Sequence, residues 1–86
     1  MRIAQKYKEN VMENITALLH NKYGKSVLSK TETANELGVS ISTMTNRMRK
    51  GINIPNYIKE DGAANTSVVF PIKDVAEYLS RTVKVL

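Results

Sequence analysis

The sequence predicts a mainly α-helical domain that carries a small β-hairpin. Apolar residues recur at helical spacing near the N-terminus, two short helices with recognisable caps follow, and two β-favouring runs then flank a turn-rich loop. With 86 residues the chain is long enough for one domain, residues 1–86, with a small core. Because there is no cysteine, we expect a fold without disulfides, as is usual in the cytoplasm.

The first predicted element is an amphipathic helix over residues 4–21, within an N-terminal extension at 1–25. We expect its apolar stripe to pack on the core, and the alternative is that part of it forms a dimer or partner contact. The stripe comprises Ile3, Tyr7, Val11, Ile15, Leu18 and Leu19.

The next segment predicts two short helices joined by a tight turn. Ser29 and Glu32 form an S-x-x-E capping box, which begins a helix by satisfying its free backbone N–H groups. Gly38 supplies the left-handed residue that ends this helix. Ser40 then caps the second helix, and Gly51 ends it.

A hairpin and a last helix complete the predicted fold. The hairpin spans residues 56–71 around the turn-rich loop 60–66. The last helix is expected over residues 72–82, with Val75, Tyr78 and Leu79 on one face.

The segment 29–51 also predicts a function. A helix, a tight turn and a second helix with a polar outer face are typical of a DNA-binding helix-turn-helix, whose second helix enters the major groove. Met44 and Met48 would anchor the inner face of that helix. Asn46 lies opposite them, where its amide can bond adenine bidentately. The residues expected to contact DNA are Ser40, Ser42, Thr43, Thr45, Asn46, Arg47, Arg49, Lys50 and Lys59.

Two runs of sequence are similar to a known family. Residues 32–40 (Glu-Thr-Ala-Asn-Glu-Leu-Gly-Val-Ser) and 70–79 (Phe-Pro-Ile-Lys-Asp-Val-Ala-Glu-Tyr-Leu) resemble the small excisionase-like and AlpA-like members of the MerR-type winged-helix superfamily. The resemblance covers residues 28–80. It implies a winged helix-turn-helix, here with an extra N-terminal helix, in which the hairpin is the wing.

The sequence departs from this family pattern at two places. Arg47 stands where such helices usually carry an apolar residue, so either its side chain extends past the core edge to a phosphate or the helix is slightly rotated. The loop of the hairpin begins with Glu60 and Asp61 and has no basic residue at its tip. These carboxylates would repel phosphate, so the usual contact of the wing with DNA is in doubt.

We therefore expect a sequence-specific double-stranded DNA-binding protein, a small transcriptional regulator of phage or mobile-element type. One alternative is a recombination directionality factor that bends DNA for an integrase, and another is a protein-interaction module. A net charge of +5 favours a polyanionic partner. Further expected partners are a second copy, in a dimer or a cooperative array, and an integrase or RNA polymerase.

We expect no enzymatic activity, cofactor, metal or membrane association. His20 is the single histidine, and no cysteine accompanies it. The run Gly24-Lys25-Ser26 resembles the end of a phosphate-binding loop, but Leu19 stands where that motif requires glycine. The apolar runs are far shorter than the roughly 20 residues of a membrane span.

Overall fold

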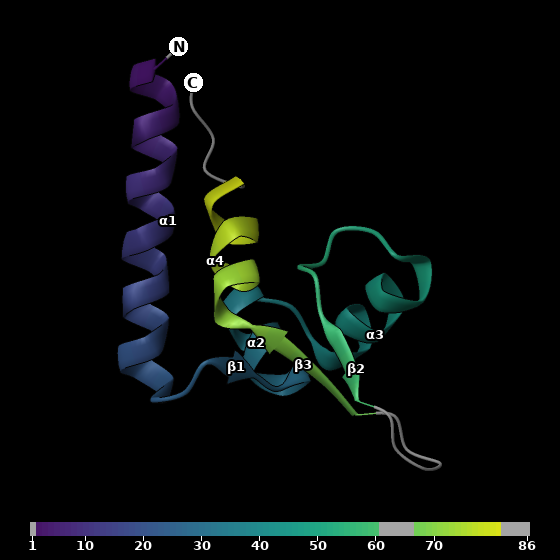
Figure 1. Ribbon diagram of the computed structural model, residues 1–86. Coiled ribbons are helices and arrows are strands. Elements are labelled where there is room, and N and C mark those ends of the chain that lie inside the picture. The colour runs from purple at the N-terminus through teal and green to yellow at the C-terminus, as the bar shows by residue number, and fades with distance from the viewer. Residues whose placement is uncertain (1, 61–66, 82–86) are drawn as a thin grey trace.

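The structure is a computed structural model that describes residues 2–60 and 67–81. These residues form four helices and a three-stranded antiparallel sheet (Figure 1). The prediction of a mainly helical domain with a small hairpin is thus confirmed. In chain order the elements are α1 (Arg2–Tyr23), β1 (Val27–Leu28), α2 (Lys30–Leu37), α3 (Ile41–Lys50), β2 (Ile58–Glu60), β3 (Ser67–Pro71) and α4 (Ile72–Arg81).

The sheet joins the hairpin to the segment that precedes α2. Its strand order is β1-β3-β2, with both pairs antiparallel. Leu28 of β1 lies opposite Phe70 of β3, and both side chains are fully buried. The sequence predicted that Val27 and Leu28 are extended, but not that they pair with β3. In chain order, α2 and α3 thus lie between β1 and β2, and both of these strands pair with β3.

One apolar core receives a side chain from nearly every element. Its buried members are Leu19, Leu28, Ala34, Met44, Phe70, Ile72 and Val75. The ring of Tyr57 packs at the edge of this core, with its centroid 5.3 Å from that of Phe70. Thr33 is also fully buried, and its hydroxyl donates a hydrogen bond to the carbonyl of Ser29. Among the described residues, no buried side-chain nitrogen or oxygen lacks a hydrogen-bond partner.

The N-terminal helix α1 packs beside α4, which runs in the opposite direction (Figure 1). Leu19 is only 4% exposed, and Ile15 and Tyr23 also pack against the core. The prediction that Leu18 belongs to this core is wrong, since 66% of it is exposed. Adjacent helical residues point about 100° apart, so a helix covered on one side buries only one of the two leucines. Ile3 lies on a part of α1 whose side chains are not described, as does Tyr7.

The last described element is helix α4. Helix α4 ends at Arg81, and the predicted face is present, with Val75 buried and Tyr78 and Leu79 half-buried. Thr82, which was predicted to end this helix, lies outside the described residues. Within residues 2–60 and 67–81, no helix is both long enough and apolar enough to cross a membrane.

Candidate nucleic-acid interface

Helix α2 begins and ends as the sequence predicted. The backbone N–H of Glu32 donates to Oγ of Ser29 at 3.1 Å, and the N–H of Ser29 donates to the Glu32 carboxylate at 2.8 Å. Both halves of the capping box are therefore formed. Gly38 adopts a left-handed conformation with φ 73°, which ends α2 and turns the chain toward α3.

Helix α3 is likewise held at both ends and along its inner face. Oγ of Ser40 accepts the backbone N–H of Thr43 at 3.1 Å, and Gly51 ends the helix with φ 71°. Met44 is fully buried in the core, and Met48 packs against it. The predicted inner face of this helix is thus confirmed.

The opposite face of α3 carries side chains that the rest of the fold does not use. These are Ser42, Asn46, Arg49 and Lys50, and all four are exposed. Within the described residues, none of them takes part in a side-chain hydrogen bond or an ion pair. We call these four residues the outer face of α3. Helix α3 contains no acidic residue, so this face combines a hydroxyl, an amide and two cations without a compensating carboxylate on the same helix.

The other predicted contact residues of α3 are engaged within the protein. Ser40 donates its hydroxyl to Oγ1 of Thr43 at 3.1 Å, in addition to its capping role. Thr45 accepts a hydrogen bond from Nζ of Lys30 on α2, at 2.6 Å. Arg47 donates from Nη1 to the backbone carbonyl of Asn53, at 3.2 Å. These four side chains would have to exchange an internal partner for a nucleic acid, whereas the outer face of α3 would not.

Two further lysines lie on other elements, Lys30 on α2 and Lys59 on β2. Lys59 is exposed on β2 and lies opposite Val68 of β3. Beyond it, residues 61–66 form the predicted hairpin tip, and this part of the chain lies outside the described residues. Sequence reasoning missed Lys30. Its bond to Thr45 joins two helices, and no local pattern in the sequence indicates such a contact.

The acidic residues of α2 are paired with the end of α1 and the loop that follows it. Nζ of Lys22 lies 2.7 Å from the Glu36 carboxylate, which Tyr23 also donates to through its hydroxyl. Burial tends to raise the pKa of Glu36, but the bonds from Lys22 and Tyr23 outweigh this and hold its pKa below the ordinary value. Glu32 likewise pairs with Lys25, at 2.9 Å. Both carboxylates of α2 are therefore neutralised by cations that do not belong to α3.

The pKa values of this cluster support the same arrangement. The backbone N–H of Ser29, followed by the Lys25 ammonium, lowers the pKa of Glu32. The Glu36 carboxylate raises the pKa of Lys22 through a hydrogen bond and its charge. All the shifts favour the charged forms of the ion pairs at neutral pH.

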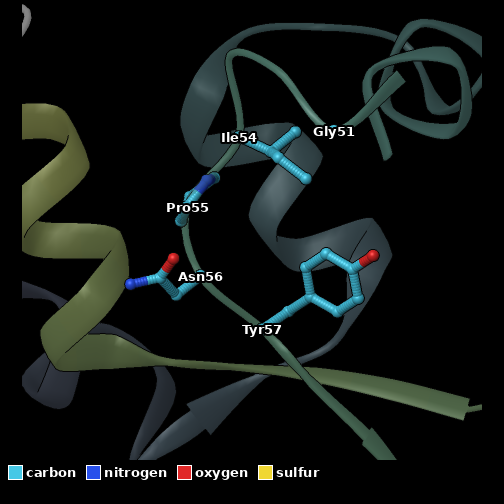
Figure 2. A pocket seen from close by; sticks show the side chains of 5 residues that line it. All are labelled: Gly51, Ile54, Pro55, Asn56 and Tyr57. Atoms are coloured by element: carbon cyan, nitrogen blue, oxygen red, sulfur yellow. The ribbon is translucent and has the colours of Figure 1, made fainter. Parts of the chain in front are cut away.

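A shallow pocket of about 410 Å³ lies beside the end of α3 (Figure 2). Its lining residues are Gly51, Ile54, Pro55, Asn56 and Tyr57. The side chains of Asn56 and Tyr57 point to different sides of the segment that leads into β2 (Figure 2). No lining residue carries a charged side chain. Over the described part of the chain, no group of three His, Cys, Asp or Glu residues could hold a metal ion.

Comparison with known proteins adds no relative to this picture. No family profile, curated protein or solved structure matches the chain. The interpretation of the outer face of α3 therefore depends on its own geometry and charge.

Proposed function

We propose that this protein binds double-stranded DNA in a sequence-specific manner, with α2 and α3 as a helix-turn-helix and the β2–β3 hairpin as its wing. Its role would be that of a small transcriptional regulator of phage or mobile-element type, as the resemblance of residues 28–80 to excisionase-like and AlpA-like proteins implies. Helix α3 would lie in the major groove.

The observation that carries this proposal is the outer face of α3. A capped helix, anchored by the fully buried Met44, presents Asn46 between a hydroxyl and two cations that have no partner within the described residues. An amide can read adenine through two hydrogen bonds, and cations can neutralise phosphates. The acids of the neighbouring helix α2 are paired with Lys22 of α1 and with Lys25 of the loop after it, so they do not oppose a polyanion at α3.

The same face does not favour the rival function of a protein-interaction module. A helix that docks into a protein groove presents apolar anchors at helical spacing. The outer face of α3 has none, since Ser42, Asn46, Arg49 and Lys50 are all polar or charged. Ile41, 44% exposed, is a single apolar residue at the start of the helix rather than a stripe.

A salt titration tests the proposal. The basic side chains assigned to DNA are Arg49 and Lys50 on α3, Lys59 on β2, and Lys30 on α2, which would exchange its bond to Thr45 for a phosphate. Arg47, bonded to the Asn53 carbonyl, is not counted, so about four phosphates should be neutralised. The slope of log affinity against log salt should then be about −3.6, which is roughly a 150-fold loss between 50 and 200 mM salt. Fluorescence anisotropy with a random-site duplex library, followed by selection of a preferred duplex, gives both the slope and the specificity.

Charge-matched variants separate this interface from general attraction. Lys50→Ala should make the slope less steep by about 0.9, because one phosphate contact is lost. Arg81→Ala removes a charge at the end of α4, which lies beside α1 and away from α3 (Figure 1), and should leave the slope unchanged. If the wild-type protein binds no duplex at 50 mM salt, the proposed function is wrong.

A further inference from the structure

The backbone carbonyl of Asn53 joins α3 to α4. It accepts one hydrogen bond from Nη1 of Arg47 on α3, at 3.2 Å, and a second from the hydroxyl of Tyr78 on α4, at 3.0 Å. We call this arrangement the Asn53 clamp. It links the helix that carries the outer face to a helix that itself offers no candidate contact residue.

The clamp holds a segment with an unusual backbone. Asn53 has φ 57°, and it is the one residue other than glycine with a positive φ in the described part of the chain. Gly51 is also left-handed, at φ 71°, so the chain reverses direction through two left-handed residues within three positions. Asparagine adopts this conformation more readily than most residues.

Arg47 contributes to this turn with its backbone as well. Its carbonyl accepts the N–H of Gly51 at 2.7 Å and the N–H of Ile52 at 3.2 Å. Arg47 therefore bonds to the turn after α3 through both its carbonyl and its side chain, and Tyr78 bonds to the same turn at the Asn53 carbonyl. The middle of α3 is fixed separately, by the buried Met44 and by the bond from Lys30 to Thr45.

We propose that Arg47 and Tyr78 are positioning residues for the outer face of α3, and that Arg47 does not itself neutralise a phosphate. This inference rests on the proposed DNA binding. Through the Asn53 carbonyl, the two side chains fix the direction of the last turns of α3. They thereby place Asn46 against the bases while Arg49 and Lys50 reach the backbone of the DNA.

Two variants remove the clamp from opposite sides. Tyr78→Phe deletes one hydroxyl on α4 and keeps the ring, and Arg47→Met deletes the guanidinium and keeps an unbranched apolar stem. Each should weaken binding to the preferred duplex about three- to tenfold, the factor expected for one lost hydrogen bond. Each should weaken binding to a random duplex less, since phosphate contacts tolerate a small change of helix direction.

The salt slope distinguishes positioning from phosphate contact. Arg47→Met should keep the wild-type slope on the preferred duplex, whereas the control Lys50→Met should make it less steep by about 0.9. The double variant Arg47→Met/Tyr78→Phe should lose less affinity than the product of the two single losses, because both side chains act on the same carbonyl. Thermal melts confirm that each variant is folded at the assay temperature.

Several results would overturn the inference while DNA binding itself stands. A slope change of about 0.9 for Arg47→Met would show that this residue contacts a phosphate. Wild-type affinity and specificity for Tyr78→Phe would show that α4 does not position α3. An equal loss on preferred and random duplexes would indicate a purely structural effect. Absence of binding by the wild-type protein would instead reject the proposed function, and the clamp's role with it.

Discussion

Two adjacent leucines on α1 provide the sharpest test of how the N-terminal helix packs. Leu19 is 4% exposed and belongs to the core, whereas Leu18 is 66% exposed. Truncating a buried leucine to alanine typically costs about 2–5 kcal/mol, because the apolar contact is lost and a cavity is left. Leu19→Ala should therefore destabilise the domain by an amount in this range.

The matched change Leu18→Ala should cost far less. With about one third of the residue buried, it loses roughly one third of the ~2 kcal/mol that a fully buried leucine contributes. Alanine's higher helix propensity offsets part of this loss. The net change should thus be within about 0.5 kcal/mol.

Thermal unfolding followed by circular dichroism measures both changes. In a domain of this size, 1 kcal/mol shifts Tm by about 4–8 °C, so Leu19→Ala should melt at least about 6 °C below Leu18→Ala. Equal losses for the two variants would refute the assigned orientation of α1. Two negligible losses would show that α1 does not contribute to the cooperative fold.

Asn46→Ala should cost about 1–3 kcal/mol of binding free energy on the preferred duplex and little on random DNA, while Lys50→Ala should weaken binding to both similarly. Competition anisotropy with the two duplexes measures these affinities. Equal losses on both duplexes for Asn46→Ala would show that this residue does not read bases. The pKa of Glu36 is lowered, so its pairing with Lys22 and Tyr23 stabilises the fold fully at pH values above 4.5, the ordinary carboxyl pKa. This stabilisation is lost as the pH falls through the pKa of Glu36 in the folded state. Denaturation by urea at pH 7 and pH 3 should therefore show a smaller acid-side loss for Glu36→Gln than for the wild type, and identical losses would contradict the pairing.

The sequence predicted the helix ends well because capping is local chemistry. Ser29, Gly38, Ser40 and Gly51 each act on backbone groups within a few residues, and all four have the predicted roles. The same holds for the buried side of α3, where the spacing of Met44 and Met48 follows from the helical period.

What the sequence did not predict depends on contacts between distant segments. The helical period placed Leu18 and Leu19 in one stripe, but only the position of the neighbouring elements decides which of them is covered. Arg47 donates to the carbonyl of Asn53, six residues away, and Tyr78 of α4, 25 residues beyond Asn53, donates to the same carbonyl. No local pattern in the sequence indicates this contact. The assignment of the remaining exposed α3 residues to DNA remains a prediction.

The N-terminal helix has a second consequence for the proposed function, through charge rather than packing. Helix α2 carries two carboxylates, Glu32 and Glu36, next to the helix that would meet a polyanion. Lys25, in the loop after α1, and Lys22, on α1, hold these carboxylates in ion pairs at 2.9 and 2.7 Å. An isolated α2–α3 unit would have the same outer face but two unpaired acids, and unscreened like charges within about 10 Å repel at physiological salt. On the proposed function, α1 and the loop that follows it therefore support DNA binding without touching DNA, because Lys22 and Lys25 neutralise the acids of α2 and the cations of the outer face of α3 stay unpaired.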